Sequence, residues 1–378
     1  MMTRTRIVWL ALFGLFMGIF GSAGSWAQEP SSDEAAAEET EMPEQTYPNL
    51  KIGGFTDINF GVSDSPGQLS NGGFSEGQFV LHFTSELSSR LSFFGELSLT
   101  ARNAGVFTPT VERSIIKYDH NNMIKLSFGR YHAPINYWNT AFHHGQWLQT
   151  SISRPDMTRF GGALIPVHFV GGLLEGSVPA HGWNLNYQLG VGNGREQTIT
   201  QGGDAFDFNN NRALLATVFV RPDRFYPLQV GGSVYRDKLT IGTTPATTRN
   251  HREMITAAHV AWTRERPEVI AEYANIDHRD LLTNRTSNSH AYYVQVAYRL
   301  PWWDEKYKPY ARYENIKTDL LDPVYTSTMF SRKGYLLGVR WDFAELLAIK
   351  GEYRRQRTTS VTQEPYVNSF NAQISYAF

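Results

Sequence analysis

The last ten residues of the chain alternate between apolar and polar side chains. Phe370, Ala372, Ile374, Tyr376 and Phe378 share one parity, and the residues of the other parity from 369 to 375 are all polar. Successive side chains of a strand point to opposite faces, so this segment predicts a strand with one apolar and one wet face. Membrane-spanning barrels contain such strands; an amphipathic edge strand of a soluble sheet is the alternative.

Similar aromatic-rich segments of about ten residues recur from residue 49 onward, and the pattern is typical of a membrane barrel. It predicts an all-β fold, a transmembrane antiparallel β-barrel of sixteen strands over residues 49–378. The expected strands centre on 50–62, 76–87, 90–102, 109–119, 122–131, 164–177, 182–193, 211–221, 226–237, 252–264, 267–278, 289–300, 306–318, 333–343, 346–358 and 367–378.

The connections between these segments alternate between two length classes. Short ones fall at 88–89, 119–121, 179–182, 222–226, 264–266, 301–305 and 343–345, and longer ones at 63–75, 131–163, 194–210, 238–251, 279–288, 319–332 and 359–366, with the brief 103–108 in phase. Short periplasmic turns and longer outer loops produce this alternation, which places both chain ends in the periplasm. A barrel of sixteen strands leaves a water-filled interior unless something plugs it.

Parity also divides the strands into a lipid face and a lumen face. In segment 333–343 the apolar Tyr335, Leu337 and Val339 face lipid, which turns Arg340 inward. The same argument places these charged residues in the lumen: Arg312, Glu314, Arg340, Lys350, Glu352 and Arg354. A lumen lined by ions of both signs is expected to hold water.

The N-terminal residues indicate export. Residues 1–27 have Arg4 and Arg6, then an apolar stretch, then small residues, which is the order of a cleavable secretory signal. Residues 28–48 are acidic and poor in large apolar side chains, so we expect a disordered periplasmic segment. The chain has no cysteine, so disulfides and thiolate metal sites are excluded, and backbone pairing and packing must hold the fold.

The longest connection, 131–163, is rich in aromatic residues and histidine. An exposed loop of this composition would carry a large apolar surface, so we expect this third outer loop to fold into the pore. Its ionisable side chains include His143, His144, Arg154 and Asp156, and Asp156 is the sole acid among them. The adjacent histidines are candidates for a metal site, for packing, or for a pH-sensitive constriction.

A family resemblance rests on the residues that precede this loop. The segment Leu126-Ser127-Phe128-Gly129-Arg130-Tyr131 resembles the start of the third loop in the sixteen-stranded porins of the Gram-negative outer membrane, and the terminal Phe378 resembles their closing residue. The resemblance implies a homotrimer whose pores are narrowed by the third loop, with Arg130 as a basic wall residue. It also implies an acidic cluster on the loop, which this chain lacks.

These features predict a passive diffusion channel for small hydrophilic solutes with a small preference for anions, because arginine side chains favour anions in a pore. Its partners would be outer-membrane lipid and lipopolysaccharide, small solutes or ions, and copies of itself, with no nucleic acid and no cofactor. We expect no enzyme, although His143 and His144 near Ser151, Ser153 and Asp156 leave a barrel hydrolase as an alternative. An adhesin or structural barrel is the other alternative.

Overall fold

The computed structural model describes residues 46–65, 72–102, 105–142, 146–159, 164–195, 199–200, 202–207, 209–242, 247–325, 330–359 and 363–378. The predicted signal at 1–27 and most of the predicted acidic segment at 28–48 lie outside the described residues. Residues Thr46–Phe378 form one compact unit. No helix within the described ranges is long and apolar enough to cross a membrane.

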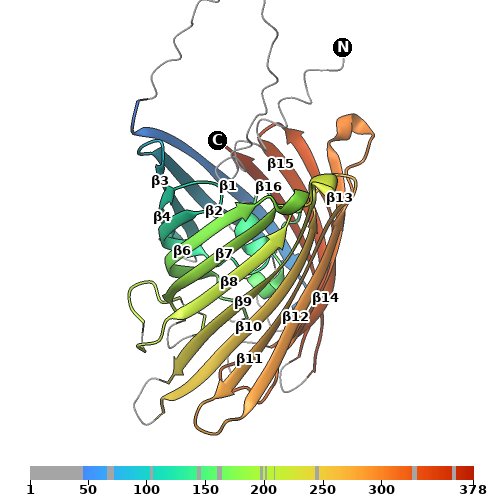
Figure 1. Ribbon diagram of the computed structural model, residues 1–378. Helices are drawn as coiled ribbons and strands as arrows, with labels where there is room; N and C mark the ends of the chain where they lie inside the picture. Colours follow the sequence, from blue (N-terminus) through green and yellow to red (C-terminus); the bar gives the residue numbers. More distant parts are fainter. Residues whose placement is uncertain are drawn as a thin grey trace, which may run out of the picture. The chain divides into compact units, whose positions relative to one another are not determined.

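Sixteen antiparallel strands close into a barrel in which each strand pairs with its neighbours in sequence (Figure 1). They are β1 (Asn49–Ser63), β2 (Gly72–Glu86), β3 (Leu91–Arg102), β4 (Val106–Asp119), β5 (Lys125–His132), β6 (His168–Val178), β7 (Leu185–Asn193), β8 (Ala213–Val220), β9 (Leu228–Ile241), β10 (Arg249–Trp262), β11 (Glu268–Asp280), β12 (Thr286–Ala297), β13 (Tyr307–Lys317), β14 (Ser331–Ala344), β15 (Leu347–Thr359) and β16 (Gln363–Ala377). The predicted fold class and strand number are confirmed.

Helical structure in the described ranges is confined to single turns within connections. Two lie between β5 and β6: α2 (Trp138–Ala141) and η2 (Asp156–Thr158). The others, η3 (Ala180–Gly182), η4 (Asp223–Phe225) and η5 (Trp303–Glu305), lie in three of the predicted short turns. The predicted separation into short turns and long outer loops therefore matches the strand bounds.

The barrel closes where the first strand pairs with the last. Phe55 lies opposite Ala377 and Ser63 opposite Ser369. The backbone N–H of Gly54 donates to the carbonyl of Phe378 at 2.9 Å, and the N–H of Phe378 donates back at 3.1 Å. A sheet closed in this way has no unpaired edge, which is the condition for a sheet to lie in lipid.

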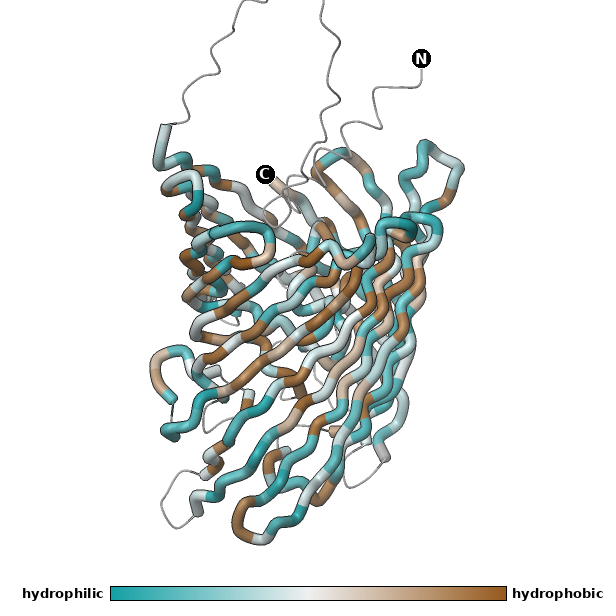
Figure 2. The backbone as a smooth tube through the Cα atoms, viewed as in Figure 1, coloured by the Kyte–Doolittle hydropathy of each residue, from teal (hydrophilic) through white to brown (hydrophobic). Residues whose placement is uncertain are grey.

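Apolar side chains face outward from the barrel at positions where parity predicted a lipid face. In β7, Leu189 and Val191 are exposed, as are Leu337 and Val339 in β14 and Ile374 in β16. Hydrophobic and hydrophilic residues alternate along the strands of the barrel (Figure 2). Monomeric soluble proteins rarely expose so wide an apolar band to water, so the wall is suited to lipid.

Aromatic side chains gather beside the short turn between β12 and β13. The rings of Tyr307 and Trp341 stack at 5.7 Å, and Trp303 lies edge-on to Tyr307 at 5.5 Å. Trp302 and Trp303 are both exposed. Such belts of tryptophan and tyrosine are typical of the membrane–water interface.

Closure of the barrel depends on the absence of a side chain at Gly54. A Cβ atom there would lie 2.5 Å from Cζ of Phe378 and 2.6 Å from the Val80 carbonyl oxygen. We expect Gly54→Val to destabilise the barrel by about 1–3 kcal/mol, as overpacking typically does, and so to lower the urea midpoint of unfolding in detergent.

Gly73→Val in β2 is the matched control, because a Cβ there meets no described atom within 4 Å. Equal urea midpoints for the two variants would contradict the role given to Gly54.

Candidate functional site

The connection between β5 and β6, residues 133–167 and here called loop 3, contacts the inner wall of the barrel. Ile135 and Trp138 near its start are completely buried. The Trp138 ring lies edge-on to Tyr293 of β12, with the ring centroids 6.1 Å apart. Loop 3 therefore occupies part of the space that the sixteen strands enclose.

Polar wall residues bind the backbone of the first limb of loop 3. The Thr217 hydroxyl donates to the Pro134 carbonyl at 2.5 Å. The Glu272 carboxylate accepts from the N–H groups of Tyr137 at 2.8 Å and Trp138 at 2.6 Å. A backbone group buried without a partner costs about as much as a lost hydrogen bond, so these wall residues make the insertion possible.

Two cations of β14 and β15 bind the next part of the loop. The Arg340 guanidinium donates to the carbonyls of Trp147 at 2.5 Å and Gln149 at 3.0 Å, and it also pairs with Asp342 at 2.7 Å. The Lys350 ammonium donates to the Gln146 carbonyl. Both cations therefore donate hydrogen bonds to backbone carbonyl oxygens of the loop.

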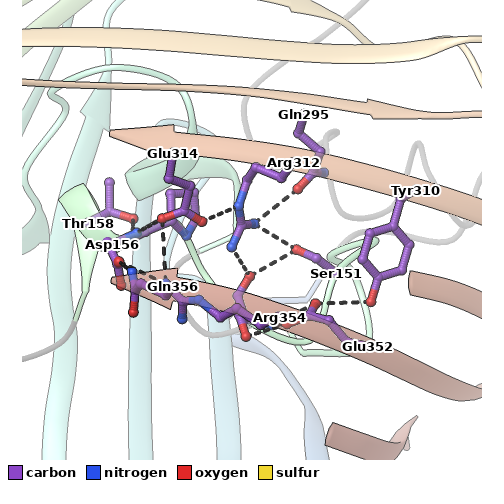
Figure 3. A network of polar contacts seen from close by, with 12 residues as sticks. Ser151, Asp156, Thr158, Gln295, Tyr310, Arg312, Glu314, Glu352, Arg354 and Gln356 are labelled. Atoms are coloured by element: carbon purple, nitrogen blue, oxygen red, sulfur yellow. Dashed lines mark hydrogen bonds and ion pairs between the residues drawn. The ribbon is translucent and has the colours of Figure 1, made fainter. Parts of the chain in front are cut away.

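A network around Arg312 holds the return limb, as Figure 3 shows. Arg312 of β13 pairs with Glu314 at 2.5 Å and donates to the Ser151 hydroxyl at 3.0 Å and the Ser153 carbonyl at 2.7 Å. Glu352 of β15 accepts from the Ser153 hydroxyl, from the Ile152 N–H at 3.0 Å and from the Tyr310 hydroxyl at 3.0 Å. The same short part of the loop is thus bound to both β13 and β15.

The wall charges predicted for the lumen lie on the inner face, but loop 3 covers most of them. The buried residues are Arg312, Glu314, Arg340, Lys350 and Glu352. Of the six, Arg354 keeps 19% of its side chain exposed. The expectation that all six line open water is therefore wrong, because the loop needs their hydrogen bonds.

Asp156 links the end of the loop to the outer part of the same wall. Its N–H donates to Glu314 at 2.9 Å, and its carboxylate pairs with Arg354 at 2.7 Å. Burial alone would raise the pKa of Asp156, but the positive charges of Arg354 and Arg332 hold that pKa below its ordinary value. Asp156 therefore stays ionised.

The opposite wall, β2 to β6, carries partly exposed ion pairs. Glu96 contacts Arg113 at 2.5 Å and His82 at 3.0 Å. Glu112 contacts His168 at 2.9 Å and accepts from the Ser98 hydroxyl at 2.7 Å. Parity could not find Glu112, because the pairing of β3 with β4 shifts between Glu96 and Leu97 and a bulge lets two successive residues face the same way.

Arg130 occupies a different place from the one that the resemblance implied. It donates to the carbonyls of Val111 at 2.8 Å and Glu112 at 2.6 Å, and it pairs with Asp204 of the next outer loop at 2.8 Å. The preceding Gly129 has φ +151°, and a Cβ there would lie 1.9 Å from the Ser114 carbonyl oxygen. This Gly-Arg pair fastens β5 to the bulge in β4, and the loop acid Asp156 pairs elsewhere.

Arg154 faces the β4 wall from loop 3. Burial lowers the pKa of Arg154 to about 9, and the nearby Glu112 carboxylate opposes this shift. At neutral pH the group is a cation in the space between the loop and the opposite wall. His143 and His144 lie outside the described residues, and within the described ranges no group of three His, Asp or Glu side chains could hold a metal ion.

Two further outer loops also reach the interior, which the sequence did not predict. His278 of β11 lies 2.6 Å from Asp322 of the loop before β14 and 3.1 Å from Glu253 of β10. Arg195 from the loop before β8 lies 3.4 Å from the same Glu253. These contacts fill the outer half of the barrel beside β9 to β12, and no periodic signal marks a loop that turns inward.

No protein-family model matches this sequence, and no curated protein matches it either. Solved structures do. OmpT of Vibrio cholerae in a trimer form is 15% identical with a TM-score of 0.56, covering 88% of this chain and 99% of that one. The outer-membrane channel DcaP of Acinetobacter baumannii is 11% identical with a TM-score of 0.60, covering 88% and 97%. OmpF of Salmonella typhi, in complex with daunomycin, is 14% identical with a TM-score of 0.59, covering 87% and 97%.

The chain has the sixteen-stranded porin fold. At these identities the likeness concerns the fold, and it extends over nearly the whole length of each neighbour. The predicted resemblance to porins and the predicted place in the bacterial outer membrane are confirmed. In this chain, buried charges of the wall hold loop 3.

The network predicts that loop 3 loosens when Arg312 is removed. Arg312→Met removes the nearest cation from the buried Glu314 and leaves it only Arg354 at 3.7 Å; breaking a buried ion pair typically costs about 3–5 kcal/mol. We expect trypsin to cleave after Arg159 at least about tenfold faster, since a change of 1.4 kcal/mol in opening free energy corresponds to that factor. The measurement is limited proteolysis of the detergent-solubilised barrel.

Lys333→Met, on the exposed face of β14, is the control and should leave the cleavage rate unchanged. Cleavage of Arg312→Met at the wild-type rate, with the barrel still resistant to unfolding by detergent at room temperature, would show that the loop does not depend on Arg312.

Proposed function

We propose that this protein is a passive diffusion channel for small hydrophilic solutes, with a small preference for anions. The observation that carries the proposal is the one-sided attachment of loop 3. Among the described residues, hydrogen bonds of loop 3 run to β8, β9, β11 and β13 to β16, whereas partly exposed ion pairs line β2 to β6 opposite. Solutes would pass between loop 3 and this opposite wall.

The charges that border the proposed path support the preference for anions. On the β2 to β6 wall, Glu96 pairs with Arg113, and Glu112 lies beside His168, which is a cation only when it is protonated. On the loop side, four arginines and one acid remain near the path: Arg154, Arg159, Arg332, Arg354 and Asp156. Basic residues at a constriction favour anions, and the single acid limits the effect.

The structural neighbours support a channel and a trimer. DcaP is described as an outer-membrane channel and one OmpT structure as a trimer form. We propose the same assembly for this chain, in outer-membrane lipid and lipopolysaccharide. Native mass spectrometry in detergent should give three times the mass of the mature chain, and a monomer mass would contradict the proposal.

The alternative of a barrel hydrolase has less support. Ser151 and Ser153 bind Arg312 and Glu352, and Asp156 binds Arg354. A nucleophile must be within reach of a base that activates it, and among the described contacts these serines meet no histidine. We therefore propose that the protein is not an enzyme. No described contact favours an adhesin.

Single-channel recording in planar bilayers tests the channel and its charge preference. We expect steady open currents and a reversal potential in a salt gradient that indicates a modest preference for anions. Arg154→Glu reverses the charge that faces Glu112, so we expect it to shift the reversal potential toward cations.

Arg355→Glu makes the same change of charge on the exposed face of β15, where the Arg355 side chain lies over the Tyr366 ring. It should leave the reversal potential unchanged. Absence of steady current from refolded wild-type protein would exclude a diffusion channel, and equal shifts in both variants would exclude Arg154 from the solute path.

A further inference from the structure

An excess of positive charge lies where loop 3 meets the outer part of β14 and β15. Three arginines meet there: Arg159 from the loop, Arg332 from β14 and Arg354 from β15. Asp156 pairs with Arg354 at 2.7 Å, and it lies 4.0 Å from Arg332. Both strands carry these arginines near the ends that join long outer loops. The cluster therefore stands at the outer entrance to the space beside loop 3.

The carboxylates of this region do not satisfy its guanidinium groups. Glu314 lies 2.5 Å from Arg312 and 3.7 Å from Arg354. Arg159 has no carboxylate within 4.0 Å in the part of the chain that the structure describes, and Asp156 at 4.0 Å is the one such partner of Arg332. Arg159 and Arg332 are also close enough for their charges to repel. Arg332 thus shares an acid that Arg354 already holds, and Arg159 has no described carboxylate at that distance.

The cluster also has more hydrogen-bond donors than its described acceptors satisfy. A guanidinium has five N–H donors and no acceptor. The buried Nε of Arg332 has no hydrogen-bond partner in the described residues, and Gln356 adds an amide donor that contacts Asp156. The side chains of Arg332 and Arg354 are 18% and 19% exposed, so water and small ions can reach them.

We propose that Arg159, Arg332 and Arg354 form a binding site, here called the station, for small solutes that carry an oxyanion. This oxyanion is a carboxylate or a phosphate group. This inference rests on the proposed channel function and names the solute class that its outer entrance takes. The planar fork of arginine fits both kinds of oxyanion. Arg159 and Arg332 bind the incoming group, and Arg354 stays with Asp156.

Asp156 acts within this station as a built-in carboxylate. Its negative charge reduces the attraction of the cluster for a second anion, so the incoming solute is held weakly and leaves quickly. A conducting pore needs such a balance, because a solute that binds tightly would block it. Replacing Asp156 should therefore strengthen binding, whereas replacing Arg159 and Arg332 should weaken it.

Line broadening of inorganic phosphate in ³¹P NMR spectra tests the station in the refolded full barrel in detergent, whether or not the barrel conducts. We expect wild-type protein to broaden the phosphate signal in a saturable way, and added succinate to reverse the broadening. The double variant Arg159→Gln, Arg332→Gln should raise the half-saturating phosphate concentration at least about tenfold, and Asp156→Asn should lower it.

The double variant Lys333→Gln, Arg355→Gln is the matched control, because it removes two charges from the exposed faces of the same two strands. It should broaden the phosphate signal like wild type. Equal broadening by all variants, or none by wild type, would overturn the station. Added lipopolysaccharide should leave the broadening unchanged; if it removes the broadening, a lipid phosphate takes the site and the assignment to solutes is wrong.

Bilayer recording separates this inference from the proposed function. If the station exists, phosphate or succinate added on the loop side reduces the chloride current in a saturable way, and the station variants lose this effect while they still conduct. Open currents that neither anion reduces would remove the station and leave the diffusion channel standing. Absence of current together with saturable broadening would remove the channel and leave the oxyanion site.

Discussion

A polypeptide in lipid has no water with which to pair its backbone, and this constraint determines the whole architecture. Each unpaired backbone group would cost several kcal/mol, so the sheet must close, and it does so through the exchange between Gly54 and Phe378. The same constraint recurs inside the barrel. Loop 3 brings irregular backbone into a crowded interior, and side chains of the wall supply the partners that a regular ladder would have supplied.

The buried charges of the wall can be understood in these terms. Arg340 and Lys350 bind carbonyl oxygens, and Glu272 and Glu352 bind N–H groups of the loop backbone. A charged group transferred out of water is costly unless it is paired and hydrogen-bonded. Here Arg340, Glu272 and Glu352 each have several polar partners, and Lys350 has the Gln146 carbonyl, so the loop gains partners for its backbone groups.

The barrel could be predicted from the sequence because each strand is specified by residues that are close together in the chain. Alternation of side chains and turn residues defines each strand without knowledge of its neighbours, and the parity of Leu337 and Arg340 in β14 was correct. The site depends on distant contacts instead. Nothing local distinguishes Arg354, whose side chain stays 19% exposed, from Arg312, which is buried beneath loop 3, since that difference arises from residues more than 150 positions away.

The bulge in β4 and the backbone at Gly129 account for the unpredicted positions of Glu112 and Arg130. One extra residue in β4 brought Glu112 to the inner wall next to Arg113, and Gly129 let Arg130 reach the carbonyls of that bulge. Both features depend on backbone geometry at single positions, which a pattern with period two does not record. The histidines of the interior, His278 and His168, became visible only with their partners from other strands.

Because most wall ions also bind loop 3, the charge of the interior cannot be changed independently of the loop at most positions. A substitution at Arg312 or Glu352 alters the charge of the interior and loosens the loop at once. Arg159 holds no described carboxylate and Arg332 shares one at 4.0 Å, so replacements there disturb little else. Natural variation in the charge of the interior would be expected to accumulate at this outer rim, while the ions beneath the loop stay constant.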